Sequence, residues 1–277
     1  MTKERWCKNL SETKEQKERW SYSRTACFAN CKYEYYLKYI LKDDEMYLPE
    51  GNYYSEVGSF MHDILAKIFD KELTLDNALM YFVENFDDNV LYKTRYSTME
   101  KTFEICTDYF AEVDFDWLDN YEVVGVEKEL HFTLGDYDFI CYIDLLLKDK
   151  RDGKYVIIDH KSVEYPYIKG TKKPKKRCIH NLTTYTNQMY LYAHAVKQNY
   201  GDFPKEMTWN HFKDEGKLAT IDFEKSIYDE IMDWYIKTIH EAENEKEFLP
   251  TYNWFYCNVL CNYRNSCEYK ESEYETR

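Results

Sequence analysis

The chain has 277 residues, of which 44% are hydrophobic and only 8 are glycine and 5 proline. This composition supplies a sizeable core and excludes an intrinsically disordered chain, and no apolar run approaches the ~20 residues of a membrane-spanning helix. The net charge of −14 is not that of a uniformly basic nucleic-acid-binding protein, so such a function would depend on how charge is distributed locally.

The N-terminal residues and the number of cysteines indicate the cellular compartment of the protein. The first residues, Met1-Thr-Lys-Glu-Arg-Trp6, are charged and lack the apolar core of a signal peptide. We therefore expect a cytoplasmic protein with no membrane partner. The nine cysteines are an odd number, which in an intracellular chain indicates free thiols or metal ligands rather than a disulfide framework.

The first part of the chain is predicted to be helical. Residues 1–20 are highly charged and are expected to form a loose arm. Ser23 can cap a helix that runs to about Leu41, and Ser55 can cap the next one, because serine oxygens accept hydrogen bonds from the first free N–H groups of a helix. Two further helices are expected over residues 74–92 and 97–118.

Residues 122–161 predict three antiparallel strands, the last two of which form a hairpin. Asp152 and Gly153 at its centre favour a two-residue type I′ loop, because both central residues of that turn need positive φ. With this loop, Arg151 would pair with Lys154, which sets the register of the whole hairpin.

Three charged side chains near the open end of this hairpin carry the main functional signal. In the expected register Asp144 lies opposite Lys161, and Asp159 projects from the same side of the sheet. Two carboxylates and an ammonium in apolar strands need compensation, which a divalent metal ion could supply; an ordinary cross-strand ion pair with a solvated Asp159 is the alternative. The flanking residues are apolar on both faces, as in a covered central strand: Leu145, Leu146, Leu147, Val156, Ile157 and Ile158.

The remaining elements complete an α/β pattern. A helix is expected over about 184–199, strands over about 206–212 and 217–223, a helix over about 224–247, and an irregular tail from 248 onward. We expect the arm (1–20) to be followed by one domain over 21–277. Its parts are a helical part (21–118), a sheet core (119–223), and a C-terminal helix with a cysteine-bearing tail (224–277).

The hairpin resembles a known family. Ile143-Asp144, followed by Ile157-Ile-Asp159-His-Lys161, resembles the core of the PD-(D/E)XK nuclease superfamily in its RecB-like exonuclease branch, although Cys141 stands where that branch usually has glycine. The resemblance implies a restriction-endonuclease-like core, with a central mixed β-sheet flanked by helices and a helical N-terminal insertion. It also implies that Asp144, Asp159 and the main-chain carbonyl of His160 hold Mg²⁺ or Mn²⁺, while Lys161 orients or deprotonates the attacking water.

Three other segments fit the same family. Gly58-Ser-Phe-Met-His62 resembles its upstream Gly-x-x-x-His motif, in which the histidine is a metal ligand; packing on an apolar helix face is the alternative. Glu127 resembles the glutamate of the preceding strand, but Glu129 points the same way, so alternation cannot choose between them. Gln188 and Tyr192, one helical turn apart, resemble a Gln-x-x-x-Tyr helix that would position the scissile phosphate or the lysine amine.

A basic segment lies between the proposed active strand and this helix. Six of nine residues are positively charged: Lys169, Lys172, Lys173, Lys175, Lys176 and Arg177. Gly170 and Pro174 predict a loop, and its position favours contact with DNA phosphates. A solvated basic loop or a sorting signal is the alternative.

Four cysteines resemble a cluster-binding set. Cys257, Cys261 and Cys267 place three thiols in eleven residues. With Cys31 they resemble the ligands of the iron–sulfur cluster in CRISPR-adaptation, AddB-type and phage exonucleases, which implies a [4Fe–4S] cluster rather than zinc. Cys27, one turn before Cys31, is an alternative ligand, and reduced thiols without a metal are another reading.

Taken together, the resemblance implies a metal-dependent DNA exonuclease that hydrolyses phosphodiester bonds at DNA ends in recombination or repair. A bacterial or phage-infected cell is the expected setting, single-stranded DNA or a frayed end the expected substrate, and a recombination or replication protein an expected partner. A structure-specific or single-strand endonuclease of the same fold and a non-catalytic DNA-end-binding subunit are the alternatives. The sequence does not fix the oligomeric state.

Overall fold

The computed structural model describes residues 19–42 and 49–269, so all but the last two residues of the predicted arm lie outside the described part. Five strands form one sheet in the order β1-β2-β3-β4-β5. Neighbouring strands are antiparallel except β3 and β4, which are parallel, so the predicted mixed sheet is confirmed. The strands are β1 (Tyr121–Leu134), β2 (Tyr137–Asp149), β3 (Tyr155–Lys161), β4 (Glu206–His211) and β5 (Lys217–Asp222).

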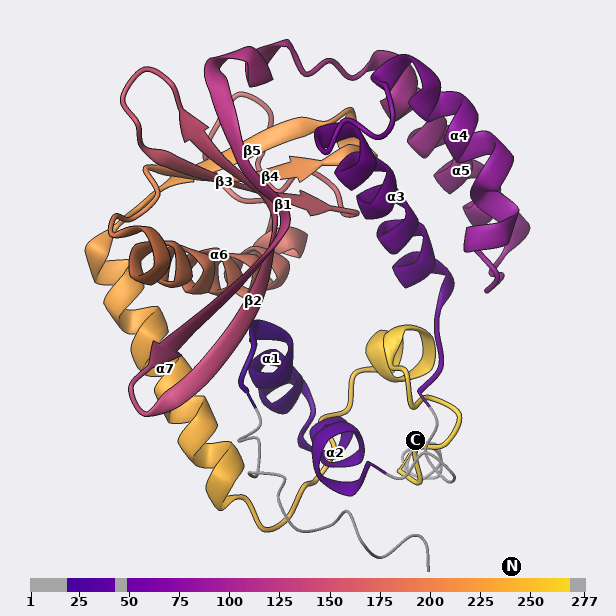
Figure 1. The fold of residues 1–277 in the computed structure, drawn as a ribbon. Helices are drawn as coiled ribbons and strands as arrows, with labels where there is room; N and C mark the ends of the chain where they lie inside the picture. The colour runs from indigo at the N-terminus through magenta and orange to yellow at the C-terminus, as the bar shows by residue number, and fades with distance from the viewer. Residues whose placement is uncertain (1–18, 43–48, 270–277) are drawn as a thin grey trace, which may run out of the picture.

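Helices cover both faces of this sheet (Figure 1). One face packs on α3 (Tyr53–Phe69), α4 (Leu75–Asn89) and α5 (Tyr96–Glu112); the other packs on α1 (Tyr22–Asn30), α6 (Ile179–Tyr200) and α7 (Lys225–Asn244). Leu145 and Leu147 belong to the first core, whereas Leu146 and Ile157 belong to the second. The continuous apolar runs of the hairpin therefore reflect burial on both faces.

The first helix differs from its prediction at both ends. Its N-cap is Ser21 rather than Ser23, and the Ser21 hydroxyl oxygen accepts a hydrogen bond from the Arg24 N–H at 3.2 Å. The helix does not continue to Leu41, because Cys31 has extended backbone angles that break it. The short α2 (Lys32–Tyr35) and the π-helical η2 (Tyr36–Leu41) follow this break.

The next helices agree with the predictions in position but not in every boundary. The cap of α3 is Asn52 rather than Ser55; its side chain accepts from the Ser55 N–H, and Ser55 completes a reciprocal capping box. The expected helix over 97–118 ends at Glu112. The 3₁₀ turn η3 (Asp116–Asn120) follows it.

The loop of the β2–β3 hairpin is longer than predicted. Gly153 has a positive φ of 71°, but Asp152 is not among the residues with positive φ, so the type I′ turn is not formed. The Asp149 N–H instead donates to the Lys154 carbonyl at 2.8 Å, which leaves a four-residue loop. The fully buried Asp149 carboxylate accepts from Arg151 and from Lys205, at 2.5 and 2.6 Å, and these contacts stabilise the longer loop.

This loop moves the hairpin register by two residues. Leu145 pairs with Ile158 and Leu146 with Ile157, so the line of pairing continues from Asp144 to Asp159. The prediction that Asp144 faces Lys161 is therefore wrong. Because side chains alternate with a period of two, a shift by two leaves the same residues on the same face.

The last described segment returns to the N-terminal part of the chain (Figure 1). It contains the π-helical η6 (Tyr256–Leu260), whose Tyr256 hydroxyl donates to the Glu34 carboxylate at 2.6 Å. The Asn52 amide donates to the Leu260 carbonyl at 3.4 Å. Separate segments of the chain are thus joined next to the start of α3. No helix among the described residues is long and apolar enough to cross a membrane.

Candidate active site and metal centre

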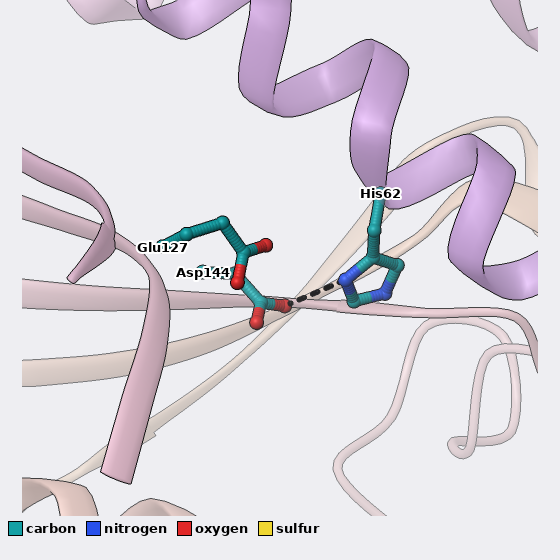
Figure 2. A group of neighbouring side chains, drawn as sticks. All are labelled: His62, Glu127 and Asp144. Atoms are coloured by element: carbon teal, nitrogen blue, oxygen red, sulfur yellow. Dashed lines mark ion pairs between the residues drawn. The ribbon is translucent and has the colours of Figure 1, made fainter. Parts of the chain in front are cut away.

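Three side chains from one helix and two neighbouring strands meet in one place. Figure 2 shows His62 of α3, Glu127 of β1 and Asp144 of β2 pointing toward one another. One ligand atom from each lies within 4.8 Å of the others. Within residues 19–42 and 49–269, no other group of three or more His, Cys, Asp and Glu residues meets this distance. Carboxylate oxygens with one imidazole nitrogen form a donor set that fits Mg²⁺ or Mn²⁺.

Glu127 reaches this group through an unusual backbone. Its φ is +43°, a left-handed conformation in the middle of a strand. The neighbouring pairs, Val126 with Leu145 and Lys128 with Ile143, place it across from Asp144. Such a conformation costs of order 1–3 kcal/mol and is concentrated at functional sites. Partial desolvation, followed by the negative charge of Asp144, raises the pKa of Glu127.

Glu129 has a different environment. Its carboxylate lies 2.6 Å from Nε2 of His131, and the side chains of both residues are about half exposed. Glu129 is absent from the group formed by His62, Glu127 and Asp144. Of the two glutamates that alternation left open, the structure therefore brings Glu127 to the candidate metal centre.

His62 links two other expected metal ligands. Its Nδ1 lies 3.4 Å from Asp144 Oδ2, and its Nε2 lies 2.9 Å from the main-chain carbonyl oxygen of His160. The His160 N–H donates to Asp144 Oδ2 at 2.7 Å. The His62 ring thus lies between the Asp144 carboxylate, on the side of Nδ1, and the His160 carbonyl, on the side of Nε2.

Asp159 and Lys161 form a buried ion pair beside this group. The Lys161 ammonium lies 2.5 Å from Asp159 Oδ2. It also donates to Gln188 Oε1 at 2.9 Å, and Gln188 Nε2 donates to the Tyr192 hydroxyl at 2.7 Å. Gln188 and Tyr192 of α6 therefore fix the lysine amine, one of the two roles expected for them. Asp159 does not belong to the three-residue group of Figure 2.

Burial dominates the electrostatics of the pair. It raises the pKa of Asp159 to about 6, since Lys161 offsets the desolvation only in part and Asp144 adds to it. Burial alone would lower the pKa of Lys161, but the carboxylates of Asp159 and Asp144 more than offset this effect and raise it. Lys161 is therefore held as a cation, and the carboxylates of Asp159 and Asp144 favour positive charge beside them.

Two contributors to the site were not singled out from the sequence. The Tyr185 ring centroid lies 4.8 Å from the Lys161 ammonium; the tyrosine precedes Gln188 by three residues, a helical spacing that could have revealed it. Asn210 of β4 donates to the Tyr109 hydroxyl at 2.9 Å, and its Nδ2 lies 3.0 Å from Nδ1 of His160. No local signal in the sequence links Asn210 to His160.

The basic segment lies in the connection between β3 and α6, as expected. Its six charges are not equivalent. Lys175 and Arg177 form ion pairs with Glu164. The other four, Lys169, Lys172, Lys173 and Lys176, are exposed and form no ion pair within the described part of the chain. The side chains of these four lysines keep their positive charge exposed on the surface.

The cysteines are brought near one another without forming a compact metal site. Cys31, Cys261 and Cys267 belong to one small apolar cluster, whereas the Cys257 thiol lies 4.0 Å from the Thr251 carbonyl. Tetrahedral zinc with Zn–S bonds of about 2.3 Å would hold its sulfur ligands about 3.8 Å apart. No cysteine occurs in a group of possible metal ligands within 4.8 Å among the described residues, so the structure does not show the expected clamp.

Comparisons with known proteins identify a family and a similar fold. The sequence pattern of the PD-(D/E)XK nuclease superfamily matches residues 19–268. The crystal structure of a "Putative exonuclease" from Eubacterium rectale is similar in fold, with a TM-score of 0.52 at 16% identity over 92% of both chains. The structure of a protein named SSO0001 gives a TM-score of 0.31 at 14% identity, over 86% of this chain and 96% of that one.

Comparison with curated proteins gives no match. The family pattern nevertheless spans every residue of the metal centre, the ion pair and the supporting helix α6. The chain belongs to the PD-(D/E)XK nuclease superfamily.

Proposed function

We propose that this chain is a metal-dependent deoxyribonuclease that hydrolyses phosphodiester bonds at DNA ends. The observation that carries the proposal is the meeting of His62, Glu127 and Asp144 beside the buried pair of Asp159 and Lys161. Carboxylates that hold a cation next to a fixed ammonium suit phosphoryl chemistry, in which negative charge must be stabilised. The name of the Eubacterium rectale protein supports an exonuclease in particular.

Each side chain has a role in this proposal. Asp144, Asp159, His62 and the His160 carbonyl would hold Mg²⁺ or Mn²⁺, with Glu127 at the same centre. The bound ion would lower the pKa of a water molecule and polarise a phosphoryl oxygen. Lys161 would orient that water and stabilise negative charge on the phosphate, while Gln188 and Tyr192 keep its amine in place.

The proposed substrate is single-stranded DNA or a frayed end, in recombination or repair with a protein partner in the cytoplasm of a bacterial or phage-infected cell. The exposed lysines between β3 and α6 would contact its phosphates. Aromatic side chains near the site would stack on unpaired bases. An endonuclease of the same fold is the second candidate, and the same assay separates the two.

The test compares end-labelled linear and circular single-stranded DNA, with Mn²⁺, with Mg²⁺ and with chelator. We expect mononucleotides or short products from linear DNA when metal is present, and no cleavage of the circle. Cleavage of the circle would identify an endonuclease. Lys161→Ala protein, purified in the same way, controls for contaminating nucleases. Wild-type protein without activity on any DNA would contradict the proposal.

Metal binding is expected to weaken in acid. A metal ligand must lose its proton, and the pKa of Asp159 is raised to about 6 from a usual value of 3.8. In the metal-free protein this raised pKa stabilises the fold at low pH, and that contribution is lost as pH rises through about 6. Through Asp159 alone, the affinity for Mn²⁺ should therefore fall about tenfold from pH 7 to pH 5. Calorimetric titration at pH 5, 6 and 7 measures it.

Asp159→Asn protein is the matched control for this pH dependence. Its affinity for Mn²⁺ should be lower than that of the wild type and should fall less steeply from pH 7 to pH 5, because the other ligands, including the His62 imidazole, must still lose their protons. A wild-type affinity that stays constant over this range would show that Asp159 does not bind the ion.

We also propose that Cys31, Cys257, Cys261 and Cys267 bind a [4Fe–4S] cluster. The support is that three of these residues lie in one apolar cluster formed by separate segments of the chain. A four-iron cluster is larger than a single ion, so its thiol ligands need not lie as close together as those of zinc. Burial raises the pKa of Cys261 to about 12, so its thiol is neutral until a metal replaces the proton.

Anaerobically purified protein is expected to be brown, with absorbance near ~400 nm and about four iron atoms per chain. Cys261→Ser should remove most of the iron and lower Tm, because the cluster joins distant segments. Cys106→Ser is the control, since this buried cysteine lies on α5, outside the proposed set. Folded wild-type protein without iron would refute the cluster.

A further inference from the structure

A small cavity lies on the α6 side of the sheet, outside the metal centre. It has a volume of about 130 Å³ and is lined by side chains from β4, from the first half of α6 and from the segment between β3 and α6. We call it the β4–α6 pocket; the lining residues that matter below are Glu164, Arg177, Leu182, Tyr185, Trp209 and His211.

The pocket adjoins the proposed catalytic pair. In the parallel ladder between β3 and β4, Trp209 pairs with Asp159 and His211 pairs with Lys161. Paired residues on adjacent strands project from the same face, and the strands are about 4.8 Å apart. Tyr185 forms a wall of the pocket and also lies over the Lys161 ammonium. A group in the pocket would therefore be one strand away from the lysine.

Two ring nitrogens at this pocket have no hydrogen-bond partner within the described part of the chain: Nε1 of Trp209 and Nε2 of His211. Their side chains are 0% and 1% exposed, so water does not reach them in this conformation, and a ligand bonds to them only when the pocket wall opens slightly. Nδ1 of His211 lies 3.1 Å from the Val163 carbonyl, which can only accept, so Nδ1 carries the proton. Trp209 thus offers a donor and His211 an acceptor.

The charge and the size of the pocket restrict which ligands could bond to these two ring nitrogens. Burial lowers the pKa of His211, so the ring is neutral near pH 7. The Glu164 carboxylate and the Arg177 guanidinium, which both line the pocket, are paired with each other, so this pair offers no strong net charge to a ligand. The volume is below the roughly 300–1,000 Å³ of pockets for drug-sized ligands, and the walls include aromatic side chains. These features suit one neutral, planar ring that carries both a donor and an acceptor.

We propose that the β4–α6 pocket receives the base of the nucleotide next to the bond that is cut, an inference that rests on the proposed nuclease function. The Trp209 Nε1–H would donate to a ring nitrogen or carbonyl of the base, and His211 Nε2 would accept from its amino or imino group. All four bases carry a donor beside an acceptor on the Watson–Crick edge, so the pocket does not select sequence. That edge is free only in an unpaired base, which makes single-stranded DNA the substrate.

The test uses single-stranded 12-mers with one abasic nucleotide at successive positions, read at single-nucleotide resolution. Wild-type protein should cut the bond next to an abasic nucleotide about tenfold more slowly than the same bond in intact DNA. Leu182→Trp should fill the pocket, cut intact DNA about tenfold more slowly, and no longer distinguish the two substrates. Leu218→Trp, at an exposed site on β5, is the matched control and should behave as wild type.

A second variant covers the case in which Leu182→Trp does not fold. Trp209→Phe keeps an aromatic ring but removes the donor, so it should cut intact DNA more slowly and reduce the discrimination against abasic DNA. Equal rates on intact and abasic DNA in wild type, or discrimination that persists in Leu182→Trp, would overturn the pocket while leaving the nuclease proposal intact.

If wild-type protein cuts no DNA, the nuclease proposal fails. A DNA-binding assay then tests the proposed role of the pocket separately. Fluorescence anisotropy in Ca²⁺ would then compare an intact 12-mer with a fully abasic one. Wild type should prefer intact DNA, and Leu182→Trp should lose about tenfold of that preference. An equal preference in both proteins would overturn the pocket.

Discussion

Replacing Lys161 with alanine is expected to lower the rate of DNA cleavage by at least about 10²–10³-fold. This is the range observed when one preorganised group that stabilises negative charge is removed from an active site. Asp159 and Gln188 fix the ammonium in place, so catalysis need not reorganise it. Single-turnover rates in Mn²⁺, with protein in excess over end-labelled single-stranded DNA, measure the chemical step.

Binding separates this catalytic effect from a loss of structure. The dissociation constant for DNA in Ca²⁺ should change little in Lys161→Ala, because the four exposed lysines of the 162–178 segment remain. Lys237→Ala is the control, because this lysine is exposed on α7 and its side chain is 78% accessible. Turnover at the wild-type rate in Lys161→Ala would contradict the assigned role.

The position of the site could be predicted from the sequence, although the pairing that forms it could not. Apolar runs ending in Asp144 and in Asp159-His160-Lys161 were enough to place the charges on one hairpin. The loop was mispredicted because Asp149 is held by Lys205, a contact between residues 56 positions apart that no local turn signal contains. The prediction of which side chains share one face of the sheet did not change, because the register moved by an even number of residues.

The choice between Glu127 and Glu129 shows a second limit. Alternation treats the two residues alike, since it assumes regular extended backbone along the whole strand. The left-handed backbone at Glu127 breaks this assumption at one of the two positions. The surrounding sheet holds Glu127 in this unfavourable conformation, so the conformational propensities of residues in the sequence cannot predict it.

The residues of β4 that lie next to the site were not singled out from the sequence, and one reason accounts for all of them. Trp209, Asn210 and His211 lie on β4, which reaches β3 only through the long crossover that contains α6. Their neighbours in space are set by a parallel pairing that carries no signature in the intervening sequence. The sequence predicted a strand there, but not which strand it pairs with or which residues of the site it adjoins.

The second large effect is expected at Asp144, where asparagine should lower the affinity for Mn²⁺ by about 100-fold or more. The amide oxygen can still accept the His160 N–H, so the local fold should persist, but the negative charge that faces His62 and Glu127 is lost. At a Mn²⁺ concentration of 100 times the wild-type Kd, the ion should stabilise the wild type by about 2.7 kcal/mol and a variant with 100-fold weaker binding by about 0.4 kcal/mol. Thermal unfolding with and without Mn²⁺ measures the difference.

Unfolding of Asp144→Asn protein without added metal separates an effect on metal binding from an effect on folding. Asp144 is 9% exposed; after partial desolvation, its charge is the next cause of the raised pKa of Glu127, so the two carboxylates repel each other. Asp144→Asn without metal should therefore unfold at the same Tm as the wild type or a higher one, while its response to Mn²⁺ is nearly lost. Asp138→Asn, exposed on the same strand, should keep the full response. An equal Mn²⁺-induced rise in Tm for wild type and Asp144→Asn would place the ion elsewhere.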